Sequence, residues 1–140
     1  MRRYILAGNW KMFKDQNEAA ELIAALLPLV LVNPRLSNPQ GEQTSSEGCL
    51  SIPEVNGDIK RAARVTVHAQ TLDGQPIVFE ATGLLARAAQ HELDHLNGIL
   101  FIDRMDAATR ASYSGKLKKM QKETLAKIKP AKSRRMFALR

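Results

Sequence analysis

The chain has 140 residues, of which 44% are hydrophobic and 25% are charged, as in a globular domain. This length predicts one domain with one core. The longest apolar stretch, residues 22–32, is interrupted by Pro28 and is too short to span a bilayer. We see no secretory signal pattern, and the single cysteine excludes an internal disulfide. We therefore expect a cytoplasmic protein with no membrane contact.

The positive charge is concentrated near the C-terminal end. The net charge is +7, but residues 115–140 carry ten Lys or Arg and only one acid. The other 114 residues carry 11 bases and 13 acids, so the body of the chain is almost neutral. A basic segment of this kind raises the local concentration of polyanions. The alternative interpretation is that this basic segment is the solvated end of a helix and binds no polyanion.

The first third of the chain predicts two strands, one helix and a loop. Arg3–Ala7 is a short β run. Asp15–Leu27 is predicted to be a helix because its apolar residues recur at helical spacing after a candidate N-cap. Leu29–Asn33 is predicted to be a buried strand, since its apolar residues do not alternate with polar ones. Pro34–Ser46 is rich in Pro, Asn, Ser and Gly and is predicted to be a surface loop.

The clearest strand pair follows in the middle of the chain. Ala63–Thr71 and Pro76–Thr82 alternate apolar and polar residues around an Asp73-Gly74 turn signal. Leu84–Leu96 is predicted to be a helix that Asn97-Gly98 ends, and the sequence predicts another helix over Ala107–Ile128 with a weak point at Gly115. The expected fold class is α+β, with a mostly antiparallel sheet packed around one central helix.

The strongest local pattern is His91-Glu92-Leu93-Asp94-His95 in the predicted central helix. Two histidines four residues apart lie on one helix face, so both imidazoles can reach one metal ion. Glu92 is placed where a carboxylate can take a proton from a water on that ion. The alternative is a solvated helix face with two surface histidines, and the pattern alone leaves both open.

Cys49, within Glu47-Gly48-Cys49-Leu50-Ser51, is a candidate third ligand. Three protein ligands leave one position open for water, as catalytic metal sites require, and a bound metal keeps a thiol deprotonated. The alternative is a buried small hydrophobe, which is the commonest role of a free cysteine. Cys49 taken alone favours this alternative.

Taken together, these segments resemble a known family. Residues 47–53 and 90–96 look like the second and third signature motifs of peptide deformylase. Further similarity lies in the segments 29–34, 83–86 and 98–103, in Arg61 and in the Asp73-Gly74 turn. The resemblance covers residues 28–128, which we interpret as a catalytic domain followed by a basic tail over residues 129–140.

This resemblance implies a reaction and the residues that perform it. Deformylases remove the formyl group from the N-terminal formyl-methionine of nascent bacterial polypeptides. The metal ion is usually Fe²⁺ in the family, with Zn²⁺, Ni²⁺ or Co²⁺ as alternatives. Glu92 is implied as the general base and later acid, the backbone N–H of Leu50 as an oxyanion donor, and Arg61 as a partner of Glu47. The implied ligands of the single ion are Cys49, His91 and His95.

The sequence departs from the family at its N-terminal end. The family's first motif, G-x-G-x-A-A-x-Q, supplies a glutamine that binds the formyl oxygen, and nothing before Leu29 matches it. We therefore expect an N-terminally truncated deformylase-like fold with weak or lost activity. Residues 1–27 instead resemble the start of triosephosphate isomerase. Asn9 and Lys11 of this chain match the substrate-binding asparagine and lysine of that family. One βα unit cannot form a barrel of roughly 200 residues, so we expect both to be ordinary surface residues of a chimeric sequence.

Two hypotheses from different classes follow. The first is a metal-dependent deformylase, active or residual, that acts on formyl-methionyl nascent peptides. The second is a catalytically inactive remnant that binds RNA or the ribosome through the basic C-terminal helix, a contact that the resemblance also implies for the enzyme. Retention of the three candidate ligands and Glu92 favours the first hypothesis, whereas absence of the first motif favours the second.

Overall fold

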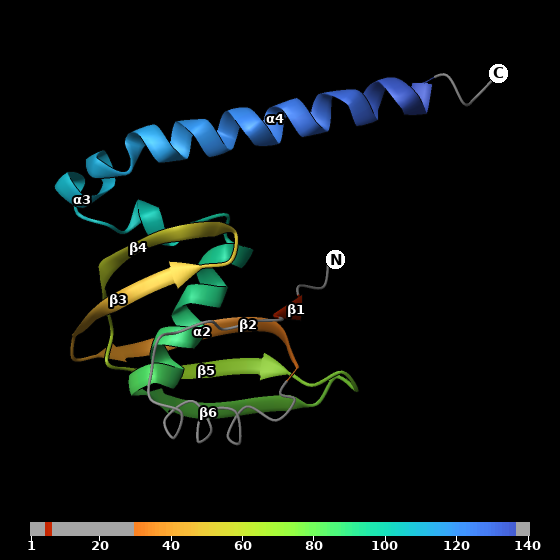
Figure 1. Ribbon diagram of the computed structural model, residues 1–140. Helices are drawn as coiled ribbons and strands as arrows, with labels where there is room; N and C mark the ends of the chain where they lie inside the picture. The colour runs from red at the N-terminus through yellow and green to blue at the C-terminus, as the bar shows by residue number, and fades with distance from the viewer. Residues whose placement is uncertain (1–4, 7–29, 137–140) are drawn as a thin grey trace. The chain divides into compact units, whose positions relative to one another are not determined.

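The computed structural model describes residues 5–6 and 30–136 (Figure 1). The chain divides into two units, Met1–Met105 and Asp106–Arg140. The predicted helix over residues 15–27 lies outside the described residues. The described elements of the first unit are β1 (Ile5–Leu6), β2 (Leu31–Gln40), β3 (Gln43–Cys49), β4 (Ile52–Arg61), β5 (Arg64–Gln70), β6 (Pro76–Thr82), the helix α2 (Gly83–Leu96) and the 3-10 helix η1 (Phe101–Asp103).

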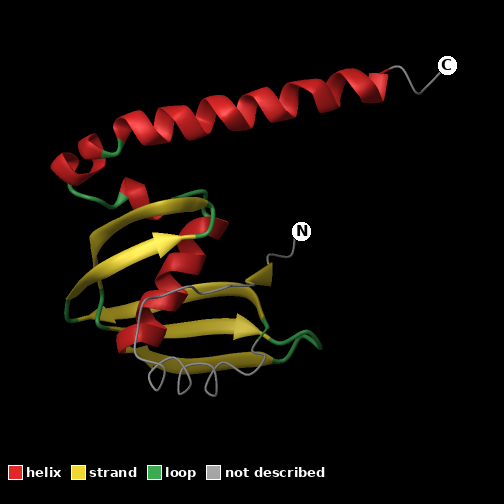
Figure 2. Cartoon of the chain, in the orientation of Figure 1, coloured by secondary structure: helices red, strands yellow, loops and turns green. Residues whose placement is uncertain are grey.

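The strands of the first unit form two antiparallel sheets around α2. One sheet has the strand order β1-β2-β5-β6, and the other pairs β3 with β4. Helix α2 contacts the four-stranded sheet and runs on past it toward the two-stranded one (Figure 2). This arrangement confirms the predicted α+β fold with a central helix.

The β5–β6 hairpin forms as its alternation predicts. Its apolar cross-strand pairs, Val65 with Ala81 and Val67 with Phe79, lie on the face that packs against the core. The turn between the strands is closed by the N–H of Thr71, which donates to the carbonyl of Gln75 at 2.9 Å. Because side chains alternate along a strand, the polar residues between these apolar ones lie on the opposite face of the hairpin.

Small side chains bring α2 close to the strands. Ala86 is fully buried, and Ala89 belongs to the same hydrophobic core. Alanine adds little side-chain bulk between a helix axis and the strands it packs on. The helix ends at Leu96, after which Gly98 adopts a left-handed conformation with φ of +75°. The sheet residues buried with the helix are Leu31, Val65, Val67, Ala69 and Ala81.

The predicted loop over Pro34–Ser46 is wrong, because β2 and β3 occupy most of this segment. The register of β2 against β5 shifts twice, between Val32 and Arg35 and between Ser37 and Gln40. Each shift contains an Asn-Pro pair whose asparagine is left-handed, with φ of 52° at Asn33 and 51° at Asn38. Such irregularities accommodate prolines in a strand, so the turn-forming composition did not prevent pairing.

The second unit contains two helices in place of the single predicted one. Helix α3 (Ala107–Ser112) begins after Asp106, whose carboxylate accepts a hydrogen bond from the Thr109 N–H at 2.9 Å. The interruption lies at Tyr113, and α4 (Ser114–Met136) extends beyond the predicted end at residue 128. None of the described helices combines the length and the apolar character needed to cross a membrane.

Candidate metal centre

Three potential ligands meet where the end of β3 faces α2. Cys49 is the last residue of β3, and His91 and His95 lie one turn apart on α2. The Cys49 Sγ atom is 3.3 Å from His95 Nε2, which is 3.2 Å from His91 Nε2. The imidazole rings meet edge to face, with an interplanar angle of 85°. The candidate ligand atoms therefore converge on one small volume.

This donor set fits a divalent transition metal. All three ligand atoms lie within 4.8 Å of one another. A tetrahedral ion with M–S and M–N bonds of about 2.3 and 2.1 Å separates its ligand atoms by about 3.4–3.6 Å, close to the spacing observed. One thiolate and two imidazoles suit Zn²⁺ or Fe²⁺ and leave one position open. Cys49, His91 and His95 thus form a possible metal-binding site.

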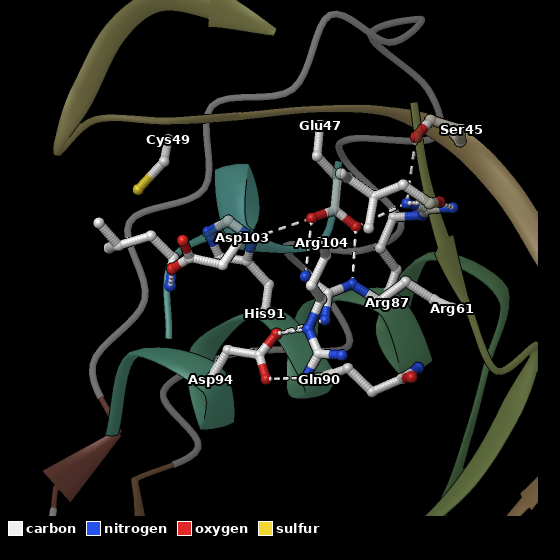
Figure 3. A network of polar contacts seen from close by, with 12 residues as sticks. Ser45, Glu47, Cys49, Arg61, Arg87, Gln90, His91, Asp94, Asp103 and Arg104 are labelled. Carbon is white, nitrogen blue, oxygen red and sulfur yellow. Dashed lines mark hydrogen bonds and ion pairs between the residues drawn. The ribbon is translucent and has the colours of Figure 1, made fainter. Parts of the chain in front are cut away.

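The buried carboxylate of Glu47 contacts His91 at Nδ1, the ring nitrogen that does not face His95 (Figure 3). Glu47 Oε2 lies 3.1 Å from His91 Nδ1. Arg61 donates two hydrogen bonds of 2.9 Å to the same carboxylate, one to each oxygen, and Arg87 donates to its Oε1 at 2.6 Å. Burial raises the pKa of Glu47, but hydrogen bonds from Arg61, His91 and Arg87 outweigh it and lower the pKa to about 2. Glu47 is therefore an acceptor at neutral pH.

A second carboxylate extends this network away from the ligands. Arg61 Nη1 donates to Asp94 Oδ2 at 2.5 Å, and Arg104 holds both oxygens of Asp94. Burial raises the pKa of Asp94, but the hydrogen bonds from Arg104 and Arg61 lower it more. Within the described residues, no buried side-chain polar atom lacks a hydrogen bond. Arg61 therefore bridges two buried acids, which explains how it is tolerated at 5% exposure.

The environment of Cys49 favours its thiolate. Burial raises the pKa of the thiol, but hydrogen bonds from Ser51 and His91 lower it below its ordinary value. Burial lowers the pKa of His91, and its contacts with Glu47 and Cys49 raise it by more. Both shifts describe a cluster in which negative and positive groups stabilise one another.

The two other predicted catalytic groups flank the ligands. Glu92 follows His91 on α2 and is half-buried, and Leu50 follows Cys49 in the turn between β3 and β4. The Leu50 side chain is 54% exposed, so this turn borders solvent. Phe101, almost fully buried, lies with its ring 6.3 Å from the His91 imidazole and forms an apolar wall. The site thus has a buried side with fixed charges and an open side at Leu50.

Comparisons with known proteins identify the family of this chain. A family model described as polypeptide deformylase matches residues 4–111. The chain belongs to the polypeptide deformylase family. The peptide deformylase of Opitutus terrae is 42% identical over 135 residues, which cover 94% of this chain and 68% of that protein. The deformylase of Chromobacterium violaceum is 45% identical over 96 residues, or 69% of this chain and 58% of that protein.

Solved deformylase structures share the fold. Peptide deformylase 1B of Arabidopsis thaliana superposes with a TM-score of 0.68 at 34% identity, over 71% of this chain and 55% of that one. The chain therefore spans little more than half the length of several deformylases that it matches. The family match begins at residue 4, N-terminal to the expected start at residue 28. The triosephosphate isomerase resemblance of residues 1–27, with Asn9 and Lys11, stays a prediction because nearly all of that segment lies outside the described residues.

The three candidate ligands named by the deformylase motifs lie together, but the motifs indicated only part of the network around them. The pairing of Arg61 with Glu47 agrees with what the resemblance implies. Sequence reasoning missed Arg87, Asp94 and Arg104 as members of the same network. A signal was present at position 87, where a lone arginine interrupts a run of small apolar residues on the core side of the predicted helix. A charged residue in such a run needs a buried partner.

Proposed function

We propose that this chain is a metal-dependent hydrolase that removes the formyl group from the N-terminal formyl-methionine of nascent polypeptides. The observation that carries the proposal is the convergence of Cys49, His91 and His95 in a member of the deformylase family. Formyl transfer to water breaks the formyl C–N bond and releases formate and a free amine. We place this reaction in the cytoplasm. The single, free cysteine agrees with a reducing compartment of that kind.

The ion would be held by Cys49, His91 and His95, with Fe²⁺ proposed and Zn²⁺, Ni²⁺ or Co²⁺ as alternatives. When bound, such an ion supplies Lewis-acid chemistry that lowers the pKa of water and polarises a carbonyl group. Glu47 orients the first histidine, because its Oε2 accepts from Nδ1 and leaves Nε2 facing the other two donors. The thiolate of Cys49 adds negative charge to the donor set.

Two further groups have roles in the proposed reaction. Glu92 takes a proton from the attacking water and delivers it to the departing amine nitrogen. The backbone N–H of Leu50 donates a hydrogen bond to the oxygen that becomes negative as water adds to the formyl carbon. The exposed turn that contains Leu50 supports this role, since a peptide can reach it from solvent.

The test is deformylation of formyl-Met-Ala-Ser by anaerobically purified, Fe²⁺-loaded protein. We expect release of formate that depends on added metal. Glu92→Ala is the control, because it removes the proton carrier and leaves all three ligand side chains. Metal-loaded protein that releases no more formate than Glu92→Ala does would refute the proposal and favour the inactive RNA-binding alternative.

We also propose that α4 brings the protein to the ribosome. The supporting observation is its charge, since residues 114–136 carry nine Lys or Arg and one acid, Glu123. Contacts with phosphates make the logarithm of the affinity fall with the logarithm of salt concentration. Removal of residues 116–140 should abolish co-sedimentation with ribosomes and leave peptide turnover nearly unchanged. Equal co-sedimentation with and without this segment would contradict the proposal.

A further inference from the structure

Arg87 is the largest fully buried side chain in the described residues, at 1% exposure. It lies on α2 one turn before His91, so the two side chains leave the same face of the helix. An arginine is rarely buried to this extent unless each part of its guanidinium group has an acceptor. The acceptors of Arg87 therefore indicate what the side chain does.

The guanidinium group of Arg87 reaches both strands of the small sheet. Nη1 and Nη2 donate to the Ile59 carbonyl at 3.2 Å, and they also contact the carbonyls of Ser45 and Gln43 at 3.3 Å. These carbonyls belong to β3 and β4. The shortest contact is with a side chain, since Nη1 lies 2.6 Å from Glu47 Oε1. Arg87 thus fixes a carboxylate relative to a rigid part of the backbone.

This contact helps to set the orientation of the Glu47 carboxylate toward the candidate metal ligands. Oε1 accepts from Arg87 and from Arg61 Nε, whereas Oε2 accepts from Arg61 Nη2 and faces His91 Nδ1 (Figure 3). Arg61 holds the carboxylate only relative to other side chains, since its third hydrogen bond goes to Asp94. The second guanidinium group, that of Arg87, is anchored to backbone carbonyls and fixes the carboxylate relative to them.

We propose that Arg87 is a positioning residue of the metal centre, acting through Glu47 to fix the ring orientation and the Nδ1–H tautomer of His91. The proposal rests on the metal centre of the proposed function and assigns it a further residue. Partners of this kind change metal affinity by about 10–100-fold when removed. A merely structural arginine would change the stability of the fold and leave the ligand geometry intact.

The experiment uses the full chain and Co²⁺, whose d–d absorption reports ligand geometry and whose thiolate charge-transfer band reports Cys49. Arg87→Met keeps much of the side-chain length and removes all the donors. We expect it to bind Co²⁺ about 10–100-fold more weakly, with shifted d–d bands and a retained thiolate band. Arg87→Lys keeps one cationic donor, and we expect an intermediate affinity.

Two controls separate positioning from stability. Val67→Ala opens a cavity in the core of the four-stranded sheet and touches none of the network, so it should lower stability and leave the Co²⁺ affinity and spectrum unchanged. In a Glu47→Gln background, Arg87→Met should weaken Co²⁺ binding far less than in the wild type, because the residue acts through that carboxylate.

Unchanged Co²⁺ affinity and d–d bands in folded Arg87→Met would overturn the inference. If circular dichroism shows that Arg87→Met does not fold, Arg87→Lys decides the question through its Co²⁺ affinity and d–d bands. Wild-type Co²⁺ affinity together with wild-type d–d bands in folded Arg87→Lys would then overturn it. A wild-type chain that binds no Co²⁺ would instead refute the proposed metal centre, so the two failures are distinguishable.

Discussion

Replacing Arg61 with methionine removes the cation that joins two buried acids. Arg61 makes two hydrogen bonds to Glu47 and one to Asp94, and its side chain is 2% exposed. Methionine fills part of the same volume without any donor. Both carboxylates stay buried, and each then depends on one remaining guanidinium group, from Arg87 and Arg104 respectively.

The cost follows from this arrangement. Removing one partner of a buried ion pair destabilises a protein by about 3–5 kcal/mol, because it leaves an uncompensated charge. Here each acid keeps a second arginine, so we expect the lower end, about 3 kcal/mol. A domain of this size is stable by only about 5–15 kcal/mol in total. The substitution should therefore remove a large share of the folding free energy.

Urea unfolding followed by circular dichroism measures this loss, and the midpoint should fall by about 1 M or more. Arg64→Met is a matched control, because the ion pair of Arg64 with Glu80, at 3.7 Å, is exposed. Exposed pairs contribute about 0–1 kcal/mol, so its midpoint should hardly move. Equal shifts for the two variants would show that the buried network contributes no more than a surface pair and would refute the reasoning.

Three further outcomes are expected. Cys49→Ala should lose most bound metal by elemental analysis, since two histidines hold a divalent ion poorly, and stoichiometric metal in this variant would contradict the ligand assignment. The pKa of Glu47 is lowered from 4.5 to about 2 on folding, so the stability it provides is present above pH 4.5 and is lost as the pH falls toward 2. Urea midpoints of the metal-free protein should fall over this range, and less steeply in Glu47→Gln. Finally, this chain offers the Leu50 N–H and no match to the first-motif glutamine, so its turnover should be about 10²–10³ below that of longer deformylases, as for loss of one oxyanion donor. Turnover equal to theirs in a parallel formyl-methionyl peptide assay would show that another residue replaces the glutamine.

The sequence predicted best the elements whose patterns are local. The β5–β6 hairpin and helix α2 follow from alternation, helical spacing and the Asn97-Gly98 ending. The predicted strand Leu29–Asn33 covers only the start of β2. The rest of β2 and most of β3 were predicted as a loop, because Pro, Asn and Ser indicate turns when they are read locally. Pairing with β5 and β4 overrides that preference, and the two Asn-Pro bulges absorb the prolines.

The candidate site shows the same division between local and distant information. His91 and His95 are a helical repeat, so their proximity could be predicted without a structure. Cys49 joins them from a strand more than 40 residues away. Ligand chemistry made it a candidate, but only the family motifs favoured it over a buried small hydrophobe. The second carboxylate, Asp94, was visible within the histidine motif, but its partners Arg61 and Arg104 come from β4 and from beyond η1. Nothing in local periodicity encodes such meetings.

The alanine face of α2 has a consequence for the spacing of the ligands. Two of the candidate ligands are on the helix and the third is on a strand, so the distance between them depends on how the helix packs between the sheets. Ala86 and Ala89 define that packing although neither is part of the polar cluster. A bulkier residue at either position would push the helix away from the four-stranded sheet and change the distance from both imidazoles to the thiol, which lies on the other sheet. Ala86 and Ala89, which are not candidate ligands, can thus determine whether the three donor atoms lie close enough together to bind one metal ion.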